Sequence, residues 1–325
     1  MTPLAYERAA SIADALRLGT RPGHHFIAGG TDLIPLWRSG TAAPLALVDV
    51  SRLPLAETHI DADGLTLGAL ALMNDVACHE AIAHSWPALT QALLSSASPQ
   101  VRHMATVGGN LLQRTRCNYF RSADLPCNKR VPGSGCPAPA GEHRLHAIFG
   151  TSEQCSAAHA SDLAVALLAL DAQVQLIGPA GPRSLPIEHL YRQPGTEPER
   201  DTVLVEGEMM RSITVPRSDR ARSLYLKVRD RASFGFAVVS VAVWVERGND
   251  GHVSHARIAA GGVGTVPWRL RASAEALLGR TLATATPQAA AVAADGAWPL
   301  ADNAFKCQLL RNSVQRALEQ LERMA

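Results

Sequence analysis

The first fifty residues consist of short apolar runs that stop at polar or glycine-rich breaks. Apolar positions at helical spacing predict a helix over residues 5–18. Residues 25–28 and 46–50 are short and apolar, which predicts two strands. Residues 34–38 predict a helix that begins directly after the turn at Gly29-Gly30. This part therefore has a strand, a glycine turn and the start of a helix in immediate succession.

The middle of the chain mixes both periodicities. Helical spacing is found over residues 74–83, 86–96 and 162–170, and strand patterns over residues 65–70, 173–177 and 203–215. Either Ser161 or Asp162 is expected to cap the helix at 162–170, because both side chains carry an oxygen that can accept a backbone N–H bond.

The last third has a different pattern. Apolar, β-rich runs cover residues 224–228, 236–246 and 252–260, and Gly-Asn-Asp-Gly at 248–251 predicts a hairpin between the last two. Helices are predicted at 271–278 and 304–323, and the second has one apolar stripe formed by Leu310, Val314, Ala317, Leu318 and Leu321. Successive strands followed by helices are typical of an α+β domain, which we predict for residues 217–325.

Composition excludes several classes of protein. The 325 residues carry 31 Lys and Arg against 29 Asp and Glu, a net charge of +2, without a concentrated basic run. This disfavours nucleic acid as a partner. No apolar run approaches the roughly 20 residues of a membrane span, and residues 1–8 show no secretory signal pattern.

Two glycine turns suggest a phosphate-bearing ligand. Gly29-Gly30 and Gly108-Gly109 each have a threonine and an Asp or Asn beside them. Such turns leave backbone N–H groups free to hold an anion. The Gly-x-Gly-x-x-Gly fingerprint is absent, and one such turn alone would be an ordinary tight turn. Together the two turns predict a ligand clamped between two subdomains.

Four cysteines form the second candidate site. Cys117, Cys127, Cys136 and Cys155 have the spacing C-x9-C-x8-C-x18-C in a loop rich in glycine, proline and basic residues. Nearby cations would lower the thiol pKa and favour the metal-binding thiolate. The residues leave four alternatives open: an iron–sulfur cluster, two disulfides, a zinc site without the usual close cysteine pairs, or free thiols. Cys78 and Cys307 lie in apolar helical surroundings and are predicted to be core residues.

Several motifs in order resemble one family. They are Ala28–Leu33, Ala105–Asn110, Ser161-Asp162-Leu163, Lys227–Phe234, Gly261-Gly262-Val263 and Pro267-Trp268-Arg269. They resemble the FAD-binding medium subunit of the xanthine dehydrogenase and carbon monoxide dehydrogenase family over essentially the whole chain. The cysteine insert, with segments 110–117, 126–130 and 133–136, resembles the flavin subunit of bacterial periplasmic aldehyde oxidoreductase, which carries a 4Fe–4S cluster next to its FAD.

The resemblance implies roles for particular residues. Those implied to bind FAD are Ala28, Gly29, Gly30, Thr31, Asp32, Leu33, Thr106, Gly109, Asn110, Ser161, Asp162 and Lys227. The first turn would hold the pyrophosphate, Asp162 and Ser161 would bond ribityl or ribose hydroxyls, and Lys227 would approach the isoalloxazine edge. The alternative for Lys227 is a solvent-facing strand residue. The implied ligands of one 4Fe–4S cluster are Cys117, Cys127, Cys136 and Cys155.

The implied fold is α+β. It has a two-part FAD-binding region like that of vanillyl-alcohol oxidase, followed by a C-terminal α+β domain with a three-stranded antiparallel sheet. We expect residues 1–53 and 54–216 to be the two FAD-binding subdomains, with the cluster insert at about 112–158.

The implied function is electron transfer within a molybdenum hydroxylase that oxidises an aldehyde. The expected partners are a large molybdopterin subunit, a small subunit with two 2Fe–2S clusters and an external electron acceptor. The expected location is the periplasm, by export with a signal-bearing partner, or the cytoplasm. The alternatives are the flavin and 4Fe–4S subunit of a 4-hydroxybenzoyl-CoA reductase-like enzyme, and a non-redox interaction subunit with a structural zinc or disulfide loop.

Overall fold

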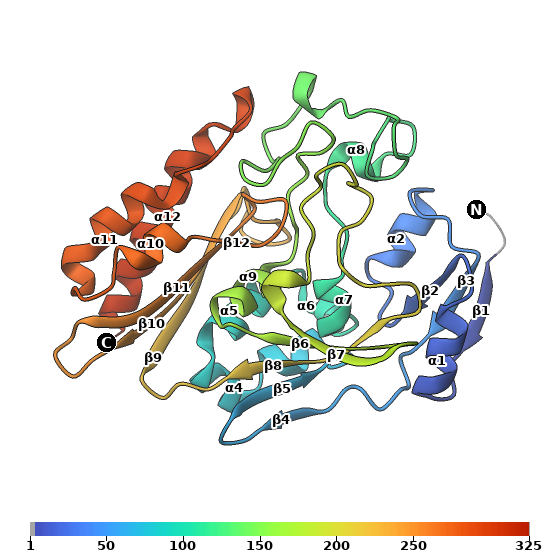
Figure 1. Cartoon of the computed structure of the whole chain (residues 1–325), viewed down its shortest axis with the longest axis horizontal. Helices are drawn as coiled ribbons and strands as arrows, with labels where there is room; N and C mark the ends of the chain where they lie inside the picture. Colours follow the sequence, from blue (N-terminus) through green and yellow to red (C-terminus); the bar gives the residue numbers. More distant parts are fainter. Residues whose placement is uncertain (1–3, 325) are drawn as a thin grey trace.

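Three sheets follow one another along the chain in the computed structural model, which describes residues 4–324 (Figure 1). The first contains β1 (Ala5–Arg8), β3 (Ala46–Asp49) and β2 (His24–Ile27) in that order, and both pairs are parallel. Helix α1 (Ile12–Gly19) connects β1 to β2, and helix α2 (Leu33–Arg38) lies between β2 and β3 in the chain. The helix predicted from residue 5 is wrong at its start. Ala5–Arg8 pairs with β3 instead, and Ser11 caps α1 by accepting a bond from the Asp14 amide.

The second sheet is antiparallel and has five strands. Their order is β4 (Thr58–Ile60), β5 (Gly64–Gly68), β8 (Met209–Pro216), β6 (Gln173–Gly178) and β7 (Gly181–Pro186). The strand predicted from residue 203 thus begins only at Met209.

The helices of the middle region lie between β5 and β6 in sequence. They are α3 (Met73–Ala77), α4 (Glu80–Ser85), α5 (Pro87–Ser95), α6 (Pro99–Arg102), α7 (Val107–Leu111), α8 (Asn118–Arg121) and α9 (Asp162–Ala169). All eight residues of α9 are buried, because it packs between α5 and the strands of the third sheet. This continuous apolar helix joins the middle region to the C-terminal part in one core.

The third sheet has four antiparallel strands in the order β12 (Trp268–Arg269), β11 (Val253–Gly261), β10 (Val239–Arg247) and β9 (Ala221–Val228). The prediction of three strands is corrected by β12, whose two residues are too few to show an alternating pattern. Helices α10 (Arg271–Glu275), α11 (Leu282–Ala291) and α12 (Phe305–Arg323) cover one face (Figure 1). The apolar stripe of α12, from Leu310 to Leu321, is buried as predicted.

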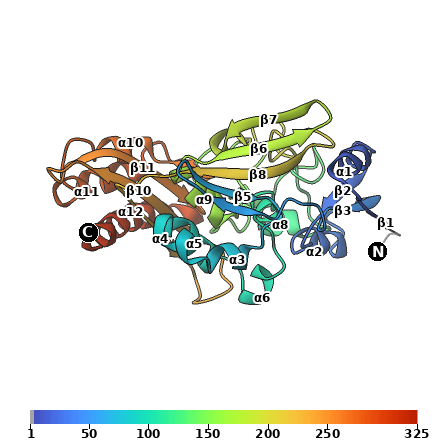
Figure 2. The same cartoon turned by 90° about the horizontal axis from the view of Figure 1, so that it is seen from below.

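The cysteine-bearing segment 112–158 crosses the molecule as an extended loop. Its only regular elements are α8 and the 3₁₀ turn η1 (Ala138–Ala140), and it lies between α2 and the start of α12 (Figure 1). Three further 3₁₀ turns occur elsewhere: η2 (Ile187–His189), η3 (Val292–Ala294) and η4 (Ala301–Asn303). Seen from below, α6 and the β9–β10 loop project from the same side (Figure 2). None of the helices from residue 4 to 324 is both long and apolar enough to cross a membrane.

Candidate cofactor-binding cleft

The Gly29-Gly30 turn lies against the main chain that leads into the second glycine turn. A Cβ built on Gly29 would lie 1.8 Å from the Met104 carbonyl oxygen, so only glycine permits this approach. Gly30 has φ +67°, a conformation that favours glycine. Both glycines are therefore required by the local geometry.

This turn presents unused hydrogen-bond donors. Within residues 4–324, the amides of Gly29, Gly30, Thr31 and Asp32 donate no hydrogen bond. They face a cavity of about 350 Å³ that Thr106 and Gly109 also line, together with residues of β2, α7 and β8. Successive free N–H groups form a concave donor surface that suits an anion.

The facing wall is built by helix caps. Thr106 Oγ1 accepts a bond from the Gly109 amide at 3.1 Å and so caps α7. Ser161 Oγ caps α9 by accepting from the Ala164 amide at 3.0 Å, and it donates to Asn110 Oδ1 at 2.6 Å. The predicted cap at Ser161 is confirmed, and Asp162 is the first residue of α9. The contacts of Thr106, Asn110 and Ser161 with FAD stay predictions.

A buried ion pair forms the floor of the cleft. Lys227 Nζ lies 2.8 Å from Asp162 Oδ2, and their side chains are 3% and 6% exposed. Ser96 Oγ and the Tyr225 hydroxyl also donate to this carboxylate, at 3.0 and 2.5 Å. Burial, together with Asp162, raises the pKa of Tyr225 well above its usual value. The solvent-facing alternative for Lys227 is therefore wrong.

Adjoining cavities extend the cleft to the cysteine loop. A space of about 200 Å³ shares Asp32 and Gly109 with the first cavity and reaches Lys227. It shares Arg116 and Phe236 with a third space of about 790 Å³, which extends to Cys117 and His146. All predicted flavin residues except Ser161, and the predicted cluster ligand Cys117, thus line a series of three adjoining cavities.

Two residues at the mouth of the cleft were not predicted. The Arg116 guanidinium lies over the ring of Phe236 with 4.8 Å to its centroid, and Phe236 is 48% exposed. Arg116 lies in the cysteine loop, and Phe236 lies 120 positions later in the connection between β9 and β10. Neither periodicity nor sequence spacing indicates that these two residues are in contact. A charged group on an exposed ring is a contact that only the fold creates.

The four cysteine thiols of the insert are electrostatic neighbours. The pKa of Cys117 is raised to about 11, chiefly by burial, with a contribution from the charges of Cys155 and Cys127. Burial likewise raises the pKa of Cys136 and of Cys155, and each of these also responds to the charge on Cys127. All six cysteines of the chain are free thiols, so the structure contains no disulfide staple.

The thiols do not form a preformed site for a single ion. Among the described residues, no three His, Cys, Asp or Glu side chains are grouped closely enough to hold one. Four sulfurs bound to one zinc ion at 2.3 Å would lie about 3.8 Å apart. Thiolates that each bind a different iron of a cluster are spaced more widely. The described residues therefore show no preformed metal site in this loop, and the choice between zinc and a cluster stays open.

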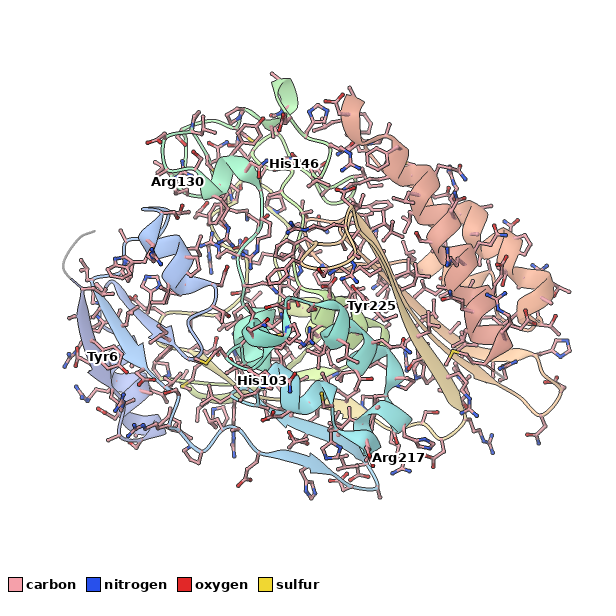
Figure 3. The ribbon with its side chains drawn as sticks, turned by 180° about the vertical axis from the view of Figure 1, so that it is seen from behind. Tyr6, His103, Arg130, His146, Arg217 and Tyr225 are labelled. Atoms are coloured by element: carbon pink, nitrogen blue, oxygen red, sulfur yellow. The ribbon has the colours of Figure 1, made fainter. Side chains whose placement is uncertain are left out.

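The basic residues do not lower the thiol pKa values overall, because burial raises those of Cys117, Cys136 and Cys155. Arg116 and Arg121 pair with Asp32, and Arg114 and Lys129 pair with Asp201. Arg130 donates to the carbonyl oxygens of Tyr119, Phe120 and Leu125 (Figure 3 labels Arg130 beside α8). Lys129 lowers the pKa of Cys155, but burial outweighs it. Metal binding would have to displace the thiol protons.

Cys78 is also placed differently from the prediction. It is exposed at the C-terminal end of α3, where the chain turns into α4, and Cys307 is half-buried on α12. Of these two cysteines, Cys307 packs against the apolar core of the C-terminal part.

A buried lysine joins the cysteine loop to the C-terminal part. Lys306 Nζ donates to the carbonyl oxygens of His146 and Gly262 at 2.9 and 2.7 Å, and Asn303 Nδ2 donates to His146 and Ala147. His146 Nε2 lies 3.2 Å from Cys117 Sγ (Figure 3 labels His146 within the loop). Lys306 is fully buried, and burial lowers its pKa to about 7.

The contribution of Lys306 to the free energy of unfolding is expected to rise as pH rises above 7. Its pKa is lower in the folded chain than in the unfolded chain, so the unfolded chain binds more protons between the two values. The difference in free energy of unfolding between the native chain and a Lys306→Met variant should grow by about 1 kcal/mol per pH unit from pH 7.5 to 9.5. Urea unfolding at several pH values measures it, and a difference independent of pH would contradict the prediction.

Comparison with known protein families identifies the family of the chain. Residues 2–218 match the FAD binding domain in molybdopterin dehydrogenase, and residues 224–321 match the CO dehydrogenase flavoprotein C-terminal domain. The chain belongs to this family of FAD-binding subunits. The prediction of an FAD-binding region followed by a C-terminal α+β domain is confirmed.

Relatives match over most or all of the chain. The FAD-binding subunit PaoB of an aldehyde oxidoreductase from Escherichia coli (strain K12) is 42% identical over 328 residues, 100% of both chains. The medium chain of glyceraldehyde dehydrogenase from Sulfolobus acidocaldarius is 26% identical and covers 86% of this chain and 82% of its own. CO dehydrogenase from Oligotropha carboxidovorans has the same fold, with a TM-score of 0.79 and 22% identity over 100% of this chain and 99% of that chain.

The donor set of the cleft fits the FAD of this family. The four amides from Gly29 to Asp32 are free to donate to an anion, and their residues line a cavity that adjoins a second one. The second cavity is lined by Lys227 and Asp162, a paired donor and acceptor. The free amides, the adjoining cavities and the buried ion pair are therefore consistent with the FAD-binding family to which the chain belongs.

Proposed function

We propose that this chain is the FAD-binding electron-transfer subunit of a molybdenum-containing aldehyde oxidoreductase, with a 4Fe–4S cluster in its cysteine loop. It would take electrons from the 2Fe–2S clusters of a small partner subunit and deliver them to an external acceptor. The observation that carries this proposal is the 42% identity, over the whole of both chains, to a subunit named for an aldehyde oxidoreductase.

The residues of the cleft have separable tasks in this proposal. The amides of Gly29 to Asp32 bind the pyrophosphate of FAD, and Gly29 allows the two glycine turns to approach. Asp162 is held by Lys227 and Tyr225, which fixes the carboxylate in place for hydroxyl groups of the cofactor. FAD, when bound, would supply the two-electron redox chemistry of this proposal.

The cysteine loop supports the second cofactor of the proposal. The charges of neighbouring thiols contribute to the raised pKa values of Cys117, Cys136 and Cys155, and each of the four thiols is at least partly buried. Cys117, Cys127, Cys136 and Cys155 would be the ligands. Because the cavity beside Lys227 continues to Cys117, the two cofactors would lie at opposite ends of one cleft.

The alternatives differ in their predicted properties. A 4-hydroxybenzoyl-CoA reductase-like subunit would use the same cofactors with electrons flowing in the opposite direction. A non-redox interaction subunit would bind neither flavin nor iron. The full-length similarity to an aldehyde oxidoreductase subunit favours the oxidising direction.

Partners and location follow from the same proposal. The substrate site would lie on a large molybdopterin subunit, in a heterotrimer with the 2Fe–2S subunit. Location in the periplasm would require export together with a partner that carries the signal, and the cytoplasm is the alternative.

The proposal is tested with the chain alone and with its partner subunits. Addition of an aldehyde to the anaerobic complex should bleach the flavin absorption within the turnover time, whereas the chain alone should show no bleaching. Reduction with dithionite provides the control for a reducible flavin in both samples. Aldehyde oxidation by the chain alone would contradict the assignment of the substrate site to a partner.

A further inference from the structure

The carboxylate of Asp32 is directed at the cysteine loop, away from the free amides of its own turn. Oδ2 accepts from the Arg114 amide at 2.8 Å, and Oδ1 accepts from Arg116 and Arg121 at 2.5 and 2.8 Å. These partners are 82 to 89 positions away in the chain. The Asp32 side chain thus binds three residues at the beginning of the cysteine loop.

The same arginines also order the loop internally. Arg121 donates to the carbonyl oxygens of Thr115 and Arg114, at 2.9 and 3.1 Å, and Arg116 donates to Arg114 O at 3.0 Å. Cys117 lies between them in sequence. The segment 114–121 therefore takes its conformation around the Asp32 carboxylate.

This contact is protected from solvent. The side chains of Asp32, Arg116 and Arg121 are 18%, 27% and 22% exposed. Leu36 of α2 and Phe120 of α8 pack with Cys127 in a small apolar cluster beside it. Charge pairs with limited exposure are screened far less than surface pairs. The connection between turn and loop is therefore both charged and packed.

We propose that Asp32 is a positioning residue that couples occupancy of the flavin turn to the order of segment 114–121, and through it to Cys117. This inference rests on the proposed function. The backbone of Asp32 faces the anion and its carboxylate holds the loop, so a ligand that fixes the turn also fixes the arginines. The coupling is reciprocal, so an ordered loop favours FAD binding.

Hydrogen exchange on the full chain, prepared without flavin and iron, tests the coupling. FAD should slow amide exchange in the 28–33 turn and, in the native chain, also in segment 114–121 by about tenfold, within the ordinary range of a coupling between sites. Each sample is measured at an FAD concentration that saturates it. The exchange of segment 114–121 with and without FAD is the quantity compared between variants.

Three variants separate coupling from general damage. Asp32→Asn removes the charge at the centre of the contact, and Arg121→Met removes one partner while leaving the turn unchanged. Asp171→Asn is the matched control. Asp171 lies outside the cleft and accepts hydrogen bonds from Arg257 and Arg269, with donor–acceptor distances of 2.8 and 2.7 Å. The control should retain the full FAD effect on segment 114–121.

We expect protection in both coupling variants to be confined to the 28–33 turn. Protection of segment 114–121 that persists in Arg121→Met, or in FAD-saturated Asp32→Asn, would overturn the proposal. A native chain in which FAD protects the turn but not the segment would overturn it as well and leave the proposed function intact. Absence of FAD protection anywhere in the native chain would instead contradict the proposed function.

Discussion

A Lys227→Met chain is expected to lose about 3–5 kcal/mol of its free energy of unfolding, because it leaves the Asp162 carboxylate buried without its cation. Ser96 and Tyr225 would still donate to that carboxylate, but hydroxyl groups do not neutralise it. The lysine is also held by the Ser95 carbonyl at 3.0 Å, so the loss removes two contacts. Denaturant unfolding of the flavin-free chain measures the effect.

The control for this prediction is an exposed ion pair. Arg217 lies 2.8 Å from Asp219, whose side chain is 80% exposed, and Arg217 is labelled at the surface in Figure 3. Arg217→Met should cost less than about 1 kcal/mol. A double variant, Lys227→Met with Asp162→Asn, should recover part of the lost stability, because it removes the unpaired charge. Equal losses in Lys227→Met and Arg217→Met would contradict the account of the cleft floor.

A Gly29→Ala chain is expected to bind FAD more weakly by about 5- to 150-fold. The added Cβ would meet the Met104 carbonyl oxygen at 1.8 Å, and a backbone atom cannot move aside as a flexible side chain can. The turn would shift, and the free amides that follow Gly29 would leave their positions. Titration of the flavin-free chain with FAD, followed by flavin fluorescence, gives the dissociation constant.

Gly248→Ala is the matched control for this substitution. Gly248 lies in the β10–β11 hairpin. Its added Cβ would come close only to the side chain of Asp250, at 2.8 Å, which can move, and would meet the His252 carbonyl oxygen at 3.8 Å, an ordinary contact distance. Its affinity for FAD should be unchanged. If Gly29→Ala bound FAD as tightly as Gly248→Ala, the close approach of the two glycine turns would not be needed for binding.

Local signals in the sequence were sufficient for much of the fold. Ser161 caps α9 because its side chain reaches an amide three residues away, and such short-range chemistry is visible in sequence. The apolar stripe of α12 and the β-rich runs of the last sheet were predicted for the same reason. The strand at Ala5–Arg8 was missed because its pairing with β3 overrides a helical pattern.

The charged contacts of the site could not be read in this way. Asp32 was predicted from its place in a motif, but the direction of its carboxylate depends on arginines more than 80 positions away. The arginines among the cysteines were interpreted by their nearness in sequence, whereas the fold pairs them with Asp32 and Asp201. Charged side chains follow no periodicity, so their partners are set by tertiary structure alone.

Absorption spectra with iron and flavin determined on the same sample of the purified chain test the central claim most directly. The account predicts flavin bands over a broad shoulder near about 400 nm and about four irons per flavin. Cys127→Ser should lose the iron and retain flavin, and Cys307→Ser should retain both. Flavin without iron in the native chain would contradict the cluster, and a folded chain with neither would contradict the electron-transfer function itself.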